Sequence, residues 1–235
     1  VEVRDAIWRG REDFIYRLTL GELPFLTRVF PLGGRRGEAV TVACEGWNLP
    51  EVVRRIAIPT GGADLLPVAV AGGNALPFAC DDLPEILVVG DTAVIEGEAV
   101  LNGRIAAPGQ VLRVRMRGLA GRDLAVEVYA RRLGSPLDGR LRLLDGAGAV
   151  LAENDDRKDA SQGLMTHHAD PGLVCRLPDS GEAVIELADA QGHGGPAHAY
   201  RLRIAAPRPG FALRALPAAL SLPAGGAAAF SVQAL

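Results

Sequence analysis

The chain has 235 residues, of which 49% are hydrophobic and only 5% aromatic, so its cores must be built mainly from Val, Leu, Ile and Ala. Its formal net charge of −3 argues against nucleic acid as a partner, because phosphate binding needs a basic excess. No apolar run approaches the ~20 residues that cross a bilayer, so we expect no membrane span in this segment.

Short segments of alternating or β-branched residues follow one another along the chain, separated by Gly, Pro, Asp and Asn turns. They predict strands at residues 14–20, 39–44, 111–116, 124–129, 140–144, 173–177, 183–187 and 200–204. Residues 50–58 suggest a short helical turn, and residues 211–235 suggest two more strands. Many short strands without intervening helices predict an all-β fold of tandem β-sandwiches.

The first residues of the chain reappear near its end. Residues 1–18 align without a gap on residues 185–202, at an offset of 184, and both segments contain Asp-Ala and end in Tyr-Arg-Leu. A repeat this long indicates a tandem array of whole domains. We therefore expect the chain to begin inside one copy of a unit, to run through a second copy and to stop inside a third.

Proline-containing connections divide the chain into four parts. We expect residues 1–24 to be the C-terminal hairpin of a preceding copy and residues 25–84 to form a small domain. Residues 85–206 would form a larger domain. Residues 207–235 would be a linker followed by the first strands of a further immunoglobulin-like domain.

Residues 25–49 contain a strand that ends in Pro31, a Gly-rich turn with Gly37, a Val-rich strand and the pattern Gly-x-Asn-Leu at 46–49. This segment resembles the opening of IPT/TIG-type immunoglobulin-like domains. Gly37 suits a tight connection, and Asn48 suits a turn because its side chain bonds to nearby backbone. The resemblance implies a sandwich that binds or spaces and does not catalyse.

Four stretches of the larger domain carry a second resemblance: the sequence LNGRI at 101–105, the strand at 137–145, the acidic loop at 151–156 and the sequence LPDSG at 177–181. Together they resemble the bacterial pre-peptidase C-terminal domain. The resemblance implies a jelly-roll-like sandwich of the kind found on secreted peptidases and other large exported bacterial proteins, with an extracellular or periplasmic location. Residues 1–24 would then be the last hairpin of a preceding copy.

The acidic loop is the candidate metal site. Asn154, Asp155 and Asp156 supply oxygen ligands of the kind that Ca²⁺ prefers, and Asp159 and Asp170 are placed to close the shell. Some domains similar to this one bind calcium, often with an acidic entry segment that contains Pro-Asn; residues 85–91 lack that pair. Two alternatives stay open: the loop makes only hydrogen-bonded turns, or Arg131 or Arg132 pairs with Asp155 and Asp156 and replaces the ion.

Signals for catalysis are few. The chain has no Gly-x-Ser-x-Gly elbow and no His-Glu-x-x-His motif. His168 and Asp170 would share one face of a strand and are the pair that a metal-dependent hydrolase would use, whereas adjacent His167 would point to the other face. Cys44 and Cys80 lie in one domain and could pair or be buried separately, and Cys175 is expected in a strand.

The sequence therefore predicts a non-catalytic accessory or spacer module of a large exported bacterial protein, with calcium as a candidate ligand. Its expected partners are other domains of the same polypeptide. One alternative is a carbohydrate- or surface-binding module, in which exposed Trp8 or Trp47 would stack on a polysaccharide or cell-surface partner. The other alternative is a metal-dependent hydrolase.

Overall fold

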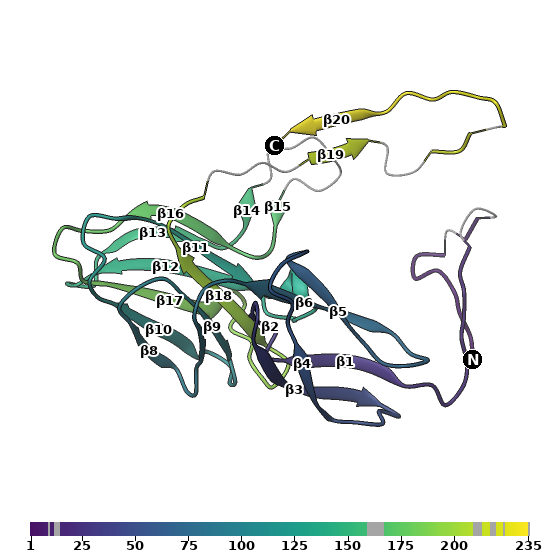
Figure 1. Ribbon diagram of the computed structural model, residues 1–235, viewed down its shortest axis with the longest axis horizontal. Helices are drawn as coiled ribbons and strands as arrows, with labels where there is room; N and C mark the ends of the chain where they lie inside the picture. The colour runs from purple at the N-terminus through teal and green to yellow at the C-terminus, as the bar shows by residue number, and fades with distance from the viewer. Residues whose placement is uncertain are drawn as a thin grey trace.

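A computed structural model of the chain describes residues 1–8, 10–11, 15–158, 167–208, 213–216, 220–222 and 224–234. Figure 1 shows two β-sandwiches side by side, from which the N-terminal segment and the C-terminal hairpin extend. Within the described ranges, no helix combines the length and apolarity that a bilayer-crossing span requires. The described part of the chain is an all-β sandwich fold, with one short 3-10 helix, η1 (Arg131–Leu133).

The first sandwich, residues 25–81, consists of two three-stranded sheets with the orders β1-β3-β4 and β2-β6-β5. Its strands are β1 (Phe25–Phe30), β2 (Gly33–Arg35), β3 (Ala39–Trp47), β4 (Val53–Ala57), β5 (Leu65–Ala69) and β6 (Ala75–Asp81). The core between the sheets contains Leu26, Val42 and Phe78, which are at most 1% exposed. Gly37 and Asn48 both adopt positive φ angles, 77° and 52°, as their predicted turns require.

The second sandwich, residues 85–205, consists of two five-stranded sheets with the orders β13-β12-β17-β10-β8 and β16-β11-β18-β9-β7. The strands of the first sheet are β8 (Thr92–Ile95), β10 (Val111–Met116), β12 (Gly139–Asp145), β13 (Val150–Asn154) and β17 (Ala183–Asp189). Those of the second are β7 (Glu85–Leu87), β9 (Ala99–Arg104), β11 (Asp123–Tyr129), β16 (Gly172–Arg176) and β18 (Ala199–Ala205). An aliphatic core that also contains Tyr200 fills the space between them.

Two short pairs complete the described structure. β14 (Arg157–Lys158) pairs with β15 (His167–His168), and β19 (Leu213–Leu216) pairs with β20 (Ser231–Ala234), both antiparallel.

Most predicted strands are confirmed, and residues 111–116 form β10 with the predicted bounds. Two predictions are wrong. The helical turn at residues 50–58 is instead β4, because Val53 and Ile56 extend along β3 and pair with it in antiparallel register. Of the strand predicted at 14–20, Phe14 lies outside the described residues, and residues 15–20 form no strand because none of the described strands pairs with them to complete their backbone hydrogen bonds.

β18 is the strand that positions the candidate site. It lies at the centre of its sheet, between β11 and β9, and all seven of its residues are buried. Alternate side chains point to opposite faces of a strand, so Tyr200, Leu202 and Ile204 fill the core of the second sandwich. Arg201 and Arg203 point from the other face, which the first sandwich covers.

Candidate functional site

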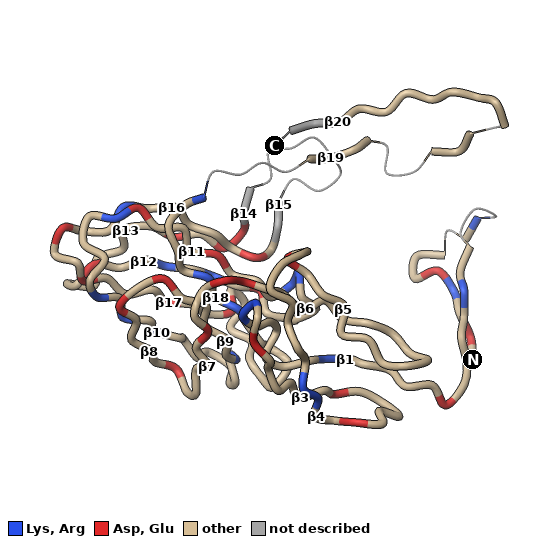
Figure 2. Tube along the Cα trace, in the orientation of Figure 1, with Lys and Arg blue, Asp and Glu red and all other residues tan. Residues whose placement is uncertain are grey.

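The two sandwiches meet on the outer face of β18, and the charged residues of this junction form buried ion pairs. Figure 2 shows basic and acidic residues gathered around β18. The guanidinium of Arg203 donates from Nε to Asp81 Oδ2 at 2.8 Å, and its Nη1 lies 3.9 Å from Glu127 Oε2. Asp81 ends β6 of the first sandwich, so the Arg203–Asp81 pair joins the two sandwiches directly. Its two side chains are only 10% and 13% exposed.

The environment of Asp81 favours its ionised form. Burial alone would raise the pKa of this carboxyl, but the Leu83 backbone N–H and the Arg203 guanidinium both donate to it and hold its pKa below the usual value. The negative charge of Asp81 is therefore part of the junction at neutral pH.

Arg201 organises a second set of contacts beneath the first sandwich. Its guanidinium donates to both carboxylate oxygens of Glu85 in β7, at 2.8 and 2.6 Å, and to Asn102 Oδ1 at 3.3 Å. The Asn102 amide donates to the same carboxylate at 2.6 Å. Gly33 of β2 lies directly against the guanidinium, because an added Cβ would be 2.7 Å from Arg201 Cζ. An added Cβ would also clash with the backbone oxygen of Ala79 in the neighbouring strand β6, so a glycine is required at this position.

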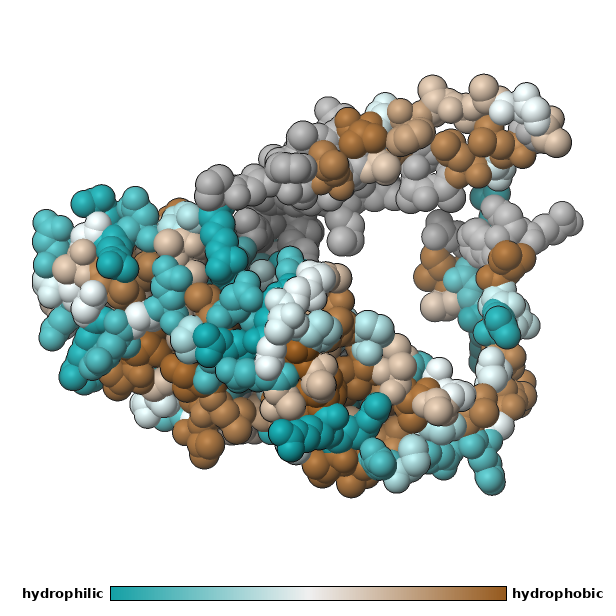
Figure 3. Space-filling view, viewed as in Figure 1, coloured by the Kyte–Doolittle hydropathy of each residue, from teal (hydrophilic) through white to brown (hydrophobic). Residues whose placement is uncertain are grey.

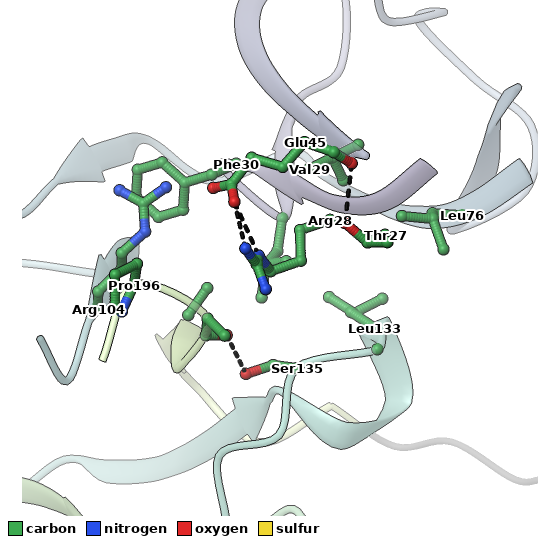
Figure 4. A pocket seen from close by; sticks show the side chains of 14 residues that line it. Thr27, Arg28, Val29, Phe30, Glu45, Leu76, Arg104, Leu133, Ser135 and Pro196 are labelled. Atoms are coloured by element: carbon green, nitrogen blue, oxygen red, sulfur yellow. Dashed lines mark hydrogen bonds and ion pairs between the residues drawn. The ribbon is translucent and has the colours of Figure 1, made fainter. Parts of the chain in front are cut away.

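An apolar contact completes the junction. The buried or partly buried side chains come from both sandwiches: Phe30, Leu32 and Ala79 from the first, and Tyr129, Leu133 and Ala199 from the second. Figure 4 shows the Arg104 guanidinium stacked on the ring of Phe30, with 3.5 Å between Cζ and the ring centroid. The same view shows Arg28 turned toward Glu45, to which it donates, around a cavity of about 10 Å³ that has room for about one water.

A groove of about 700 Å³ runs beside the junction, between the first sandwich and the β11–β16 side of the second. Leu65 lines it on one side and Val174 on the other. Four of the arginines that line it, Arg36, Arg132, Arg201 and Arg203, already have acidic partners: Arg36, for example, donates to Asp64 at 2.6 Å, and Arg203 pairs with Asp81. The groove therefore presents ion pairs rather than a concentrated positive charge.

The residues predicted to bind calcium do not act alike. The Asn154 amide donates to the backbone oxygen of Asp156, and its carbonyl oxygen accepts from the Gly172 N–H at 3.1 Å. Asp155 Oδ1 accepts from the Asp156 N–H at 3.0 Å. These bonds form a hydrogen-bonded turn, which is one of the two alternatives to a calcium site given above. The carboxylate of Asp156 takes part in none of these three bonds.

Asp170 is fully buried and bound to η1. Its carboxylate accepts from the backbone N–H groups of Arg131 and Arg132, at 2.7 and 3.1 Å, and from Arg132 Nε at 2.9 Å. An arginine pairing of the predicted kind exists, but with a different acid: Arg132 binds Asp170. Each oxygen of Asp170 already accepts an N–H.

The remaining candidates do not converge on a reactive centre within the described residues. Asp159 and the side chains of His167 and His168 lie outside the described part of the chain. In the part that is described, no three His, Cys, Asp or Glu side chains come together as metal ligands. The cysteines are free, with Cys44 and Cys80 buried, and Cys175 lies in β16 as expected.

Sequence reasoning missed the junction, because it places a domain boundary at residue 84 and treats Tyr-Arg-Leu at 200–202 only as part of a repeat. A detectable signal was the placement of two arginines, Arg201 and Arg203, at alternate positions of an otherwise apolar strand: that pattern indicates an outer face with buried acidic partners.

No protein-family profile matches the chain, and no curated protein sequence matches it. Among solved structures, the chain is similar to the pre-peptidase C-terminal domain of a collagenase from Bacillus anthracis, with 8% identity and a TM-score of 0.34. That match covers 50% of this chain and 97% of the other. The chain is also similar to PliG, a periplasmic inhibitor of g-type lysozyme from Aeromonas hydrophila, with 15% identity, a TM-score of 0.33, and coverage of 51% and 98%.

The fold class rests on the strand order described above. Membership of the pre-peptidase C-terminal family for residues 85–206 stays a prediction, as does the IPT/TIG resemblance of residues 25–84.

Proposed function

We propose that this chain is a non-catalytic spacer module of an exported bacterial protein, in which the two sandwiches form one rigid unit that holds other domains of the same polypeptide at a fixed distance. The observation that carries the proposal is the Arg203–Asp81 ion pair between the sandwiches. Only three residues separate the end of β6 at Asp81 from the start of β7 at Glu85, so the connection is too short to let the sandwiches swing freely while these contacts persist.

The rigidity is measurable with a pair of spin labels. Val53 on β4 and Val94 on β8 are 59% and 56% exposed and lie on different sandwiches, so each accepts a labelled cysteine once the three native cysteines are replaced by alanine. We expect one narrow distance distribution by pulsed electron paramagnetic resonance, and a broader one in the Arg203→Met variant. A broad distribution in the unmodified junction would contradict the spacer function.

Calcium belongs to this proposal as a stabiliser of the acidic loop. The ligands on offer are the carboxylates of Asp155 and Asp156 and nearby carbonyl groups, since Asp170 is bound to η1. Isothermal titration of the chain with calcium chloride tests this, with the Asp155→Asn/Asp156→Asn variant as control. Export is tested separately, by locating the protein in fractions of the host cell.

A binding function is the second candidate, favoured by one pair of aromatic side chains. Phe25 and Trp47 are paired across β1 and β3, are 49% and 65% exposed, and have ring centroids 6.2 Å apart. Such a pair offers an apolar platform for a sugar ring. Affinity electrophoresis in polysaccharide gels decides this: retardation that Trp47→Ala abolishes and Trp8→Ala preserves would favour the binding module.

A further inference from the structure

The N-terminal segment reproduces the first two hydrogen bonds of a turn of the second sandwich, at the repeat offset of 184. Asp189 ends β17, and its Oδ1 accepts a hydrogen bond from the backbone N–H of Gln191 at 3.0 Å. Asp5 does the same with the backbone N–H of Ile7 at 3.3 Å. The side chain two residues before the donor fixes the start of both turns in the same way.

The backbone of the two turns also agrees. The N–H of Gly192 bonds to the carbonyl oxygen of Asp189 at 3.0 Å, and the N–H of Trp8 bonds to that of Asp5 at 3.2 Å. Gly192 has a φ of 74° and Trp8 has a φ of 59°. A positive φ is ordinary for glycine but costly for tryptophan, so intrinsic preference does not explain why Trp8 adopts it. The N-terminal segment therefore forms the same turn as the one that follows β17 in the connection to β18.

The residues on either side of this turn differ from their counterparts in burial and in strand pairing, because residues 1–5 and 15–20 form no strand. β17 and β18 are central strands of opposite sheets, and their core-facing residues Ile185, Leu187, Tyr200, Leu202 and Ile204 are at most 1% exposed. The equivalent residues Val1, Val3, Tyr16, Leu18 and Leu20 are 97%, 50%, 72%, 50% and 70% exposed. Figure 3 shows apolar surface along this segment, away from both sandwiches.

We propose that residues 1–5 and 15–20 are the last two strands of a further sandwich of the same kind as residues 85–205, and that the partner they bind is a sandwich core equivalent to residues 85–184. Each strand would lie between two others, as β17 lies between β12 and β10 and β18 lies between β11 and β9. The sandwiches of this chain cannot accept them in this way, because β17 and β18 already occupy those positions. An open sheet edge would cover only one side of each strand. The proposal does not depend on the spacer function.

A fusion tests this pairing directly. Residue 185 aligns with residue 1, so a copy of residues 85–184 joined to Val1 supplies a core of the proposed kind without a gap or an added linker. We expect hydrogen exchange of the backbone amides of residues 15–20 to slow at least 100-fold in the fusion relative to the parent chain. Exchange rates equal to those of the parent would overturn the proposal.

Controls separate pairing from chance association. Tyr16→Asp should abolish the added protection in the fusion and leave melting of the parent chain unchanged, because Tyr16 is 72% exposed there. Protection of residues 15–20 that grows with the concentration of the parent chain would identify another copy of this chain as the partner, and would refute the proposal.

A second variant keeps the proposal falsifiable if the fusion aggregates. Residues 185–202 of the parent are replaced by residues 1–18, which have the same length. We expect this chimera to unfold cooperatively, at a lower temperature than the parent, whereas a chimera with the same 18 residues in scrambled order should not fold. Equal loss of cooperative unfolding in both chimeras would count against the proposal.

Discussion

Removing Arg203 is the perturbation that should weaken the junction most specifically. In Arg203→Met the carboxylate of Asp81 keeps its bond from the Leu83 N–H but loses the guanidinium that lay 2.8 Å away. Two opposite charges about 4 Å apart attract by about 4 kcal/mol at an effective dielectric constant of about 20, and breaking one partner of a buried pair costs about 3–5 kcal/mol. Since both side chains retain some exposure, we expect a loss of about 3 kcal/mol.

Thermal unfolding followed by circular dichroism measures this loss. For a chain of this size about 3 kcal/mol corresponds to a fall in Tm of about 10 °C. The double variant Asp81→Asn/Arg203→Met should lose less than the sum of the single variants, with a coupling energy of about 1 kcal/mol or more. Arg115→Met, on the exposed side of β10, is the matched control and should change Tm little. Additive losses in the cycle would refute the reasoning, because they would mean that the two charges do not stabilise each other.

Three further outcomes are expected. Because the pKa of Asp81 is lowered in the folded chain, the stabilisation by its carboxylate is complete above the unfolded-state pKa of about 3.9 and is lost as the pH falls below it. Urea unfolding at several pH values should therefore show that the free energy of unfolding falls more steeply with acid in the wild type than in Asp81→Asn. Asp170→Asn should lower Tm equally with calcium and with chelator, whereas Asp155→Asn should lower it only when calcium is present; a chelator-sensitive effect of Asp170→Asn would show that this carboxylate binds the ion after all. Tyr200→Phe should raise the free energy of unfolding by about 1 kcal/mol in urea titrations, because the hydroxyl of Tyr200, buried deeply enough to raise its pKa, has no hydrogen-bond partner among the described residues; a loss of similar size would mean that the hydroxyl is bonded.

The strands were predictable because their signal is local. β10 alternates buried Leu112, Val114 and Met116 with exposed arginines, so its sequence alone fixes both its type and its bounds. Residues 50–58 have no such alternation, and pairing with β3 decides their structure. Alternation of apolar and polar residues predicts a strand wherever one face of that strand is buried and the other is exposed to solvent.

The junction and the role of Asp170 were not predictable in this way, because both depend on partners distant in sequence. The sequence predicts Asp170 as a metal ligand from its position near the acidic loop and His168, yet the amides that bind it lie 38 and 39 residues earlier. Arg203 lies 122 residues from Asp81. A buried acid offers its oxygens equally to an ion or to N–H donors, and only the fold shows which of them reaches it.

The repeat allows the effect of structural context on stability to be measured by making the same Leu→Ala substitution at two equivalent positions. Leu18 and Leu202 each follow Tyr-Arg, but Leu202 is fully buried and Leu18 is 50% exposed. Leu202→Ala should cost about 2–5 kcal/mol, because it leaves a cavity between the sheets, whereas Leu18→Ala should change the free energy of unfolding by less than about 0.5 kcal/mol. Both are read from urea titrations of the full chain. Equal costs would mean that residues 15–20 are packed against this same chain in solution. That result would remove the basis for assigning them to the core of a further sandwich.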